Sequence, residues 1–581
     1  MTRVGTPRLG TLGLALALLA ACAAERGGPS DAASTDAPSL DAGDAAPDGG
    51  TLEASTDAAA ADAAVPDAQA VDAAAADATP REPSAWPTRA AGPWALAGLS
   101  VPAPRTASVA ATCRVDVAPP SMGAATPALR AALAEAGARA ADPSRAPDAR
   151  CVVALAPGTY AVDATLEVPS GVTLSGAGAG SSVLAARFGG RAAPVIVVRG
   201  DGRVARAHTG LDVGGYLDER SLTAPVPLVE AAAALLAADG AAFVHVEIEN
   251  DPAKLPARWA RDYGVRAQGQ LARVVAAAGT TLTLDRPLDD DYPIGGAYPV
   301  TLTLHPRAAF ARDVVIEALT VDRVDDVHAS TIELTYAADV RVARVEAVRT
   351  GWAHLAADLS LSLEIVESWF HGAHGFGDGG RGYGVNLRRH VTGARVEDNV
   401  LEDLRHALIL QIGANGNVVA FNLSRESHDD LGFQKADVSL HGHYAHRNLI
   451  EGNDVEMIHV SDWWGPTPAQ TVFANVVRRG GITVDDGSEG VVVVDNRSAA
   501  AVALRAPLTV DASVRLVFCL ANVGLDGAPL AARHARCDDE NLPSADVYAP
   551  RPASLSRAAP LRTAAGELPA LARWRSGRPI P

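Results

Sequence analysis

The chain has 581 residues, of which 48% are hydrophobic and 20% charged, and its formal net charge is −18 at pH 7. Twelve acidic residues and one arginine between residues 23 and 80 supply −11 of that charge, so the remainder is only mildly acidic. The length allows one large domain with additions, and the acidic balance argues against a nucleic-acid partner.

The first 22 residues are typical of an export signal. Arg3 and Arg8 precede an apolar run that is too short to span a bilayer. The run ends in Leu19-Ala20-Ala21-Cys22, which resembles the bacterial lipobox. This resemblance implies lipidation of Cys22, and Ala23 after it implies sorting to the outer membrane or cell surface. The alternative is an ordinary cleaved signal peptide with a coincidental cysteine.

Residues 23–85 are rich in Ala, Asp, Ser, Gly and Pro. Up to Pro80 this segment has no aromatic residue, and from Asp57 to Asp77 an aspartate recurs every five residues, which is the period of neither a helix nor a strand. Such a segment cannot bury enough apolar surface to offset the entropy of ordering. We expect a disordered tether, with the lipid as the only contact with the membrane.

Four further cysteines, Cys113, Cys151, Cys519 and Cys537, lie in the rest of the chain. An even number in an exported protein favours disulfides, for which three pairings exist. Pairing of sequence neighbours, Cys113 with Cys151 and Cys519 with Cys537, would close each end of the folded region. Free buried thiols are the alternative.

The stretch 154–184 resembles the opening coils of the pectate lyase-like β-helix superfamily. The resemblance lies in Pro157-Gly158-Thr159-Tyr160, Val168-Pro169-Ser170-Gly171-Val172 and Gly176-Ala177-Gly178. In that superfamily an amphipathic helix caps the N-terminal end of the coils, and residues 125–140, with Leu129 and Leu133, are the candidate here. We therefore expect residues 100–194 to form this cap and the first coils.

Residues 195–305 have a different pattern. The runs FVHVEIEND (243–251), QLARVVAAAGTTLTLDRPL (270–288) and YPVTLTL (298–304) are typical of antiparallel strands, with a turn at Ala278-Gly279. We expect a small inserted β subdomain.

Residues 306–500 repeat a short motif that ends in asparagine. Asn399, Asn422, Asn453, Asn475 and Asn496 are separated by 23, 31, 22 and 21 residues, so one period is about 22 residues and one coil carries an insertion. Stacked asparagines can hydrogen-bond to their neighbours above and below, and the apolar runs around them are buried only when coils stack. The pattern predicts an all-β fold, a right-handed parallel β-helix, with residues 501–581 as a C-terminal cap and tail.

Enzymes of this superfamily mostly cleave acidic polysaccharides, by β-elimination or by hydrolysis. Elimination from a uronate needs a cation that neutralises the carboxylate and a base that removes the α-proton, whereas hydrolysis needs two carboxyl groups at a set separation. The signature sets of polygalacturonases and pectate lyases are absent, and Asp429-Asp430 lacks the other hydrolase elements. Glu451, Asn453 and Glu456 are similar to the calcium-binding coils of alginate and dermatan lyases but differ in spacing, so calcium stays an open cofactor and metal ligands stay unknown.

The motif DVSLHGHYAHRN (437–448) lies in a stretch, 369–464, that holds most of the fifteen histidines. On a strand, Asp437, Ser439, His441 and His443 would share one polar face, while Val438 and Leu440 point into the core. We predict that this polar face lines a cleft bordered by the preceding insertion and by a tryptophan loop. A zinc site at the two histidines and a merely solvated face are the alternatives.

The predicted roles follow from residue chemistry. One of the two histidines would be the base, and an arginine and a lysine would bind substrate carboxylates, which gives the catalytic set His441, His443, Arg405 and Lys435. The predicted substrate-binding residues are His406, His459, Trp463, Trp464, Arg381 and Tyr383.

These patterns together favour a surface-anchored, monomeric β-helix protein that acts on an acidic polysaccharide by lyase-type β-elimination. A non-catalytic carbohydrate-binding or adhesion lipoprotein is one alternative, and a polysaccharide hydrolase is the other.

Overall fold

The computed structural model describes residues 113–142, 150–252, 255, 266–377, 380–428, 436–462, 464–485, 488–499, 508–510, 518–520, 522–526, 555–556 and 559–581. The predictions made for the export signal, the tether, Cys22, Asp429-Asp430, Lys435, Trp463 and Cys537 fall outside these residues and stay predictions. Among the helices within these ranges, none is both long and apolar enough to cross a membrane.

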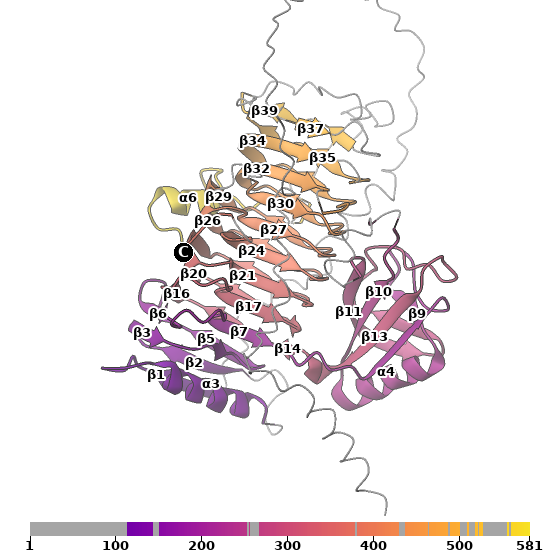
Figure 1. Cartoon of the computed structure of the whole chain (residues 1–581), viewed down its shortest axis with the longest axis horizontal. Coiled ribbons are helices and arrows are strands. Elements are labelled where there is room, and N and C mark those ends of the chain that lie inside the picture. Colours follow the sequence, from indigo (N-terminus) through magenta and orange to yellow (C-terminus); the bar gives the residue numbers. More distant parts are fainter. Residues whose placement is uncertain are drawn as a thin grey trace, which may run out of the picture. The chain divides into compact units, whose positions relative to one another are not determined.

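The described chain is mostly β-strand, wound into stacked coils with three faces (Figure 1). The strands of the first face are, in stacking order, β1 (Cys113–Val117), β2 (Cys151–Leu155), β5 (Val172–Ser175), β15 (Val315–Glu317), β19 (Arg341–Ala343), β22 (Glu364–Val366), β25 (Arg395–Glu397), β28 (Val418–Ala420), β31 (Leu449–Glu451), β33 (Thr471–Phe473), β35 (Val492–Val494) and β38 (Phe518–Leu520). All of them pair in parallel, and Val396, Val419 and Ile450 illustrate one row. The predicted parallel β-helix is confirmed, with the right-handed crossover that such connections take.

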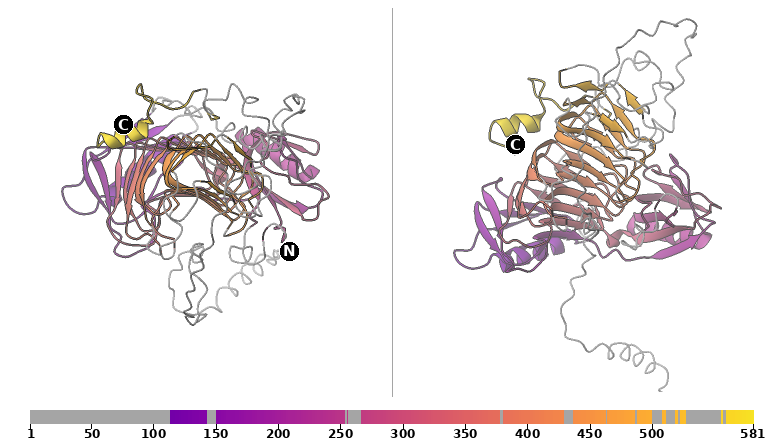
Figure 2. Two further views of the ribbon diagram at one scale, coloured as in Figure 1. Left: turned by 90° about the horizontal axis from the view of Figure 1, so that it is seen from above. Right: turned by 45° about the horizontal axis from the view of Figure 1, so that its top comes forward.

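The other two faces form one continuous sheet, because β32 (Asp454–Ser461) and β34 (Val476–Val484) run through both. The second face also contains β3 (Gly158–Val162), β6 (Ser182–Ala186), β16 (Thr320–Arg323), β20 (Glu346–Thr350), β23 (Trp369–Ala373), β26 (Val400–Leu404), β29 (Leu423–Ser427), β36 (Arg497–Ser498) and β39 (Val523–Gly524). The third face also contains β4 (Leu166–Glu167), β7 (Ile196–Arg199), β17 (Ile332–Thr335), β21 (Ala353–Asp358), β24 (Tyr383–Arg388), β27 (Leu408–Leu410), β30 (Val438–His441) and β37 (Leu508–Val510). Figure 2 shows strands of successive coils one behind another.

The predicted asparagine stack is present at the corner between the first and second faces. Nδ2 of Asn399 donates to Oδ1 of Asn422, and Nδ2 of Asn422 to Oδ1 of Asn453, both at 2.9 Å. The row continues through Asn475 and Asn496 to Asn522. The 31-residue spacing is accommodated between β29 and β30, away from this corner.

The stacked asparagines from Asn399 to Asn496 each follow a residue with left-handed backbone, which turns the chain from one face to the next. The φ angles are 56° at Asp398, 57° at Phe421 and 55° at Ala474. A second, shorter stack that the sequence analysis did not identify precedes the first face, where Asn417, Asn448 and Gln470 are hydrogen-bonded in the same way.

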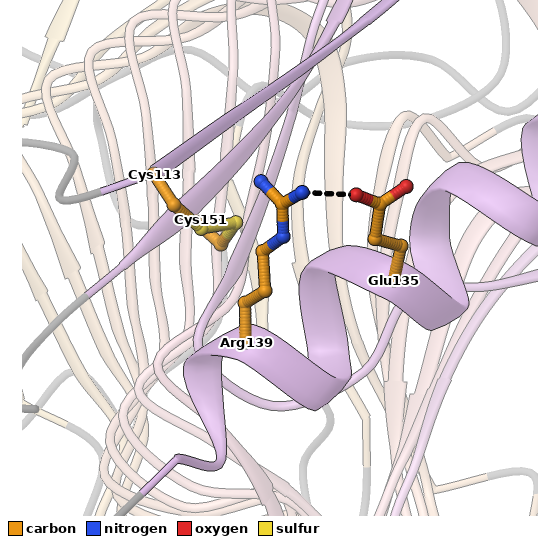
Figure 3. The surroundings of a disulfide bond; sticks show 4 residues. All are labelled: Cys113, Glu135, Arg139 and Cys151. Atoms are coloured by element: carbon orange, nitrogen blue, oxygen red, sulfur yellow. Dashed lines mark hydrogen bonds and ion pairs between the residues drawn. A yellow bond between two sulfur atoms is a disulfide. The ribbon is translucent and has the colours of Figure 1, made fainter. Parts of the chain in front are cut away.

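Helix α3 (Thr126–Ala140) lies against β1, β2 and β5 at the first coils (Figure 1). Its Leu129 and Leu133 are buried in the same apolar core as the inward side chains of the coils. Cys113 and Cys151, which are register partners on β1 and β2, form the predicted disulfide (Figure 3). Cys519 is also disulfide-bonded, but its predicted partner Cys537 lies outside the described residues, so that pairing stays a prediction.

The inserted β subdomain is a six-stranded antiparallel sheet in the order β8 (Arg206–Gly210), β13 (Val300–Pro306), β10 (Ala242–Ile248), β11 (Gly269–Ala278), β12 (Thr281–Leu284) and β9 (Ser221–Thr223). Helix α4 (Val226–Asp239), which the sequence analysis did not predict, packs on one side of it. The sheet returns to the coils through a short 3-10 helix, η1 (Arg307–Ala309), and the parallel pair β14 (Ala311–Arg312) and β18 (Ala337–Ala338). The predicted turn at Gly279, with φ 60°, connects β11 to β12.

The C-terminal residues differ in part from the expected cap. Strands β37, β38 and β39 continue the coils as expected, but helix α6 (Pro569–Arg575) packs beside the middle coils. There Arg573 pairs with Asp398 at 2.8 Å, and the indole of Trp574 donates to Glu402. This packing buries Leu568 and Leu571, which supply the apolar surface that holds the segment in place.

The asparagine stack predicts a large cost for a single truncation. Asn453→Ala removes four side-chain hydrogen bonds to residues of the coils on both sides, and it leaves the buried backbone N–H and one amide hydrogen of Asn422 without an acceptor. Each unsatisfied group costs about 1–3 kcal/mol, so we expect the free energy of unfolding to fall by at least about 3 kcal/mol in denaturant titration. The exposed Thr280→Ala in the β11–β12 turn is the control, and equal effects of the two substitutions would contradict the proposed role of the stack.

Candidate functional site

Three of the predicted site residues meet on successive coils. The ring of His406 lies 5.3 Å from that of Tyr383 and 5.4 Å from that of His441. Val438 and Leu440 point into the core, as the alternation predicted. The structure therefore brings the side chains of Tyr383, His406 and His441 together.

The open cleft predicted around these residues is wrong, because the cluster is buried. Tyr383, Arg405, His406 and His441 are all 0% exposed, and His443 is 2% exposed. Trp464, which was expected to present its indole to solvent, is 5% exposed and stacks on the ring of His443. The strand's alternation gave the inward direction of Val438 and Leu440 correctly, but it did not show whether the opposite face is covered.

The predicted common face of His441 and His443 is also wrong. Strand β30 ends at His441, and Gly442 and His443 have φ angles of 74° and 51°, so His443 belongs to the following turn. Arg381 lies apart from this cluster, where its guanidinium pairs with Asp326 and donates to the carbonyl of Gly351. His459 is register partner of Ser439 rather than of His441, and its Nε2 lies 2.6 Å from Asp485.

Asp437, at the start of this motif, keeps its proton to a higher pH than an ordinary aspartate does. Burial and the neighbouring carboxylate of Glu456 raise its pKa to about 7. The backbone N–H of Glu456 donates to one of its oxygens. A buried polar carboxyl of this kind links folding stability to pH.

A cavity of about 250 Å³ lies where the inserted sheet meets the coils. One wall is a column of residues that occupy equivalent turn positions after the third face, namely Tyr336, Leu359, Arg389 and Ile412, with His390 next to them. The other wall comes from β10 and β13 and the segment before β8, namely His245, Glu247, Thr303, His305 and Val204.

The floor of this cavity is buried and its rim is accessible. His245, His305 and His390 are between 2% and 7% exposed, whereas Val204 at the rim is 55% exposed. Arg389 and Glu247 are half-buried, so a ligand that enters the cavity would meet both a cation and a carboxylate.

His305 is held in one orientation. Its Nδ1 is 3.0 Å from the carbonyl oxygen of Arg203, which only accepts, so Nδ1 carries the proton and Nε2 the lone pair. Nε2 is buried and has no hydrogen-bond partner among the described residues. Burial lowers the pKa of His305, which keeps the imidazole unprotonated at neutral pH.

Tyr336 and Arg389 complete the polar part of the cavity. The ring of Tyr336 lies 5.9 Å from that of His305, and burial raises the pKa of its hydroxyl, which therefore keeps its proton at neutral pH. The Nε of Arg389 is buried without a hydrogen-bond partner in the part of the chain that is described. An anionic ligand would supply that partner.

His245 and His390 are in direct contact across the two walls. Nε2 of His245 lies 2.8 Å from Nδ1 of His390. Burial, followed by nearby positive charge, lowers the pKa of both imidazoles to about 3, so both are neutral. Glu247 lies on the same face of β10 as His245, with its carboxylate 3.7 Å from Nδ1 of that ring.

The sequence analysis missed this site. Arg389 and His390 stand in the histidine-rich stretch, but His245, Glu247 and His305 lie in the insertion and were interpreted only as strand residues. The signal was present in FVHVEI and VTLTLH, where polar residues alternate with the apolar residues of the sheet's own core.

No family model and no curated protein matches the chain. Among solved structures, the tailspike gp61 of Pseudomonas phage phi297 is similar, with 13% identity and a TM-score of 0.45 over 70% of this chain and 68% of that one. The A-module of a mannuronan C-5 epimerase from Azotobacter vinelandii is 10% identical, with a TM-score of 0.31 over 69% and 90%. An exopolygalacturonase from Thermotoga maritima is 8% identical, with a TM-score of 0.29 over 71% and 91%. At these values the fold assignment rests on this chain's own strand pairing.

The raised pKa of Asp437 predicts how stability responds to pH. Between about pH 4, the pKa of an unfolded aspartate, and pH 7 the folded chain holds a proton that the unfolded chain loses, so this residue lowers stability as pH rises. In Asp437→Asn the free energy of unfolding should fall less steeply with pH over this range, by up to about 1.4 kcal/mol per pH unit. Urea unfolding at several pH values measures this slope. The exposed Asp239→Asn is the control. A variant with the same pH dependence as the wild type would show that Asp437 ionises normally.

Proposed function

We propose that this protein acts on an acidic polysaccharide by β-elimination, and that the cavity at the junction holds one uronate unit. The observation that carries the proposal is that Arg389 and the unpartnered Nε2 of His305 line the same cavity of about 250 Å³. These are the anion neutraliser and the base that elimination requires.

The proposed reaction assigns one task to each of three side chains. Arg389 binds the uronate carboxylate and neutralises its negative charge, which lowers the pKa of the adjacent α-proton. Nε2 of His305 takes that proton as the C–H bond breaks and a carbon–carbon double bond forms. The phenol of Tyr336 gives its proton to the glycosidic oxygen as the C–O bond breaks.

This assignment differs from the prediction made from the sequence. His441, His443 and Arg405 are buried and do not line this cavity. Within the elimination class, the base and the cation are therefore proposed to be residues of the junction instead.

Hydrolysis is the less favoured reaction because of the carboxylates. A hydrolase places two carboxyl groups on either side of the scissile bond, and among the residues that line the cavity Glu247 is the one carboxylate. The binding-only alternative differs from both reactions because a protein that only binds the polysaccharide releases no product.

Single substitutions in the cavity should separate binding from chemistry. We expect His305→Ala to lower kcat by about 100- to 10,000-fold with KM little changed, since it removes the base. Arg389→Ala should raise KM as well as lower kcat. Pectate, alginate and glycosaminoglycans are screened by the ultraviolet absorbance of unsaturated uronate ends, with reducing ends counted in parallel.

The exposed His328→Ala, outside the cavity, is the matched control and should retain activity. Reducing ends without ultraviolet absorbance would indicate hydrolysis, and binding without either product would favour the adhesion alternative. Full activity of His305→Ala would refute the assigned base.

We also propose that the protein is exported and anchored through lipid on Cys22, on the strength of the signal sequence and the tether. Cys22→Ser removes the acceptor of the lipid, so the substituted protein should leave the membrane fraction for the soluble fraction in cell fractionation with immunoblotting. Retention of the substituted protein with the membrane would exclude lipid on this cysteine as the anchor.

A further inference from the structure

Three metal-ligating side chains meet between the inserted sheet and the coils. His245 and Glu247 come from β10, and His390 from the turn after β24. One ligand atom of each lies within 4.8 Å of the other two. They are contributed by segments 145 residues apart, so the inserted sheet has to be docked for the group to exist.

Each histidine directs its outer ring nitrogen toward an oxygen. Nε2 of His390 is 3.2 Å from the carbonyl oxygen of Ala267, and Nδ1 of His245 is 3.7 Å from the carboxylate of Glu247. The Ala267 carbonyl fixes the proton of His390 on Nε2, as an oxygen acceptor does for a metal-binding histidine, whereas the distance from His245 to Glu247 is too long for a hydrogen bond. The nitrogens left to bind an ion are Nε2 of His245 and Nδ1 of His390.

Those two nitrogens are already close to the spacing that an ion needs. They are 2.8 Å apart, with one proton shared between them in the metal-free chain. A tetrahedral zinc ion with bonds of about 2.1 Å needs about 3.4 Å between two nitrogens, so the rings have to separate by roughly half an ångström. The ion takes the place of the shared proton, and the proton on His245 moves to its other ring nitrogen, Nδ1.

The backbone around His390 leaves room for its ring and for little else. A Cβ atom on Gly269 would lie 2.6 Å from Cε1 of His390, and one on Gly413 would lie 2.3 Å from Cδ2. Glycines on β11 and on the next coil thus form a slot that holds the imidazole in place from both sides. A ring held in this way loses little entropy on binding an ion.

We propose that His245, Glu247 and His390 bind a divalent transition-metal ion of the zinc type. Two imidazole nitrogens and one carboxylate oxygen are a ligand set that zinc uses in sites that keep a fourth position for water. That fourth position faces the cavity, which the same three residues line. The ion ties the inserted sheet to the coils, and its binding does not depend on the proposed elimination reaction.

The test is zinc binding by the purified full chain after dialysis against a chelator. Isothermal titration with Zn²⁺ alone should give one equivalent for the wild type, accompanied by a rise in Tm. Glu247→Gln, which removes a charged ligand, should weaken the affinity by more than about 10-fold, and His390→Asn and His245→Ala should abolish this equivalent.

Two controls locate the ion. His208→Ala, on β8 of the same sheet, and His441→Ala, in the buried histidine cluster, should each keep the equivalent. Circular dichroism first shows that each variant is folded, and Glu247→Gln, which preserves the shape of the side chain, gives the reading where a histidine variant does not fold. Absence of zinc binding by the wild type, unchanged binding by a folded His390→Asn or by Glu247→Gln, or loss of binding by His441→Ala would overturn the proposal.

Discussion

The amide-to-amide hydrogen bond between corner asparagines is the interaction on which the rest of this fold depends. Each of these amides is buried, so its oxygen and nitrogen need partners, and the coils on either side supply them at 2.9 to 3.0 Å. A residue gained or lost on the first face would break a row of such bonds. Extra residues are therefore found away from this corner, before β30 and between β7 and β14.

The same register aligns residues of successive coils into columns at other turns, where the asparagine stack does not restrict the residue type. At the turn after the third face the column contains a tyrosine, a leucine, an arginine and an isoleucine, all with φ between 45° and 52°. The inserted sheet docks beside this column through bonds such as Leu271 N–H to Thr392 Oγ1 and Asn415 Nδ2 to the carbonyl of Gly269. One wall of the cavity is thus made by residues that recur about every 22 positions along the coils. The other wall is made by alternate residues of β10 and β13.

The repeat of the coils could be recognised in the sequence, whereas the junction between the inserted sheet and the coils could not. The spacing from Asn399 to Asn496 recurs within one stretch of chain, so it identified the β-helix, and the alternation at Val438 and Leu440 identified their inward direction. The junction has no such recurrence, because His245 and His390 are brought together only by how the insertion packs. Burial of His441 was equally out of reach, since the residues that cover a face do not appear in the strand's own alternation.

Buried polar side chains therefore need a second criterion before they indicate a site. On the third face, Gln411 donates to Asn386 of the neighbouring coil at 3.1 Å and Ser439 lies 3.0 Å from Nδ1 of His441. Nε2 of His406 is nevertheless buried there without a hydrogen-bond partner among the described residues. At the junction, Nε2 of His305 and Nε of Arg389 have no partner among the described residues and also border a cavity. A buried polar group without a partner costs about 1–3 kcal/mol, and a cavity beside it is where a ligand can remove that cost. That combination, rather than the density of histidines, distinguishes the junction from the histidine-rich face.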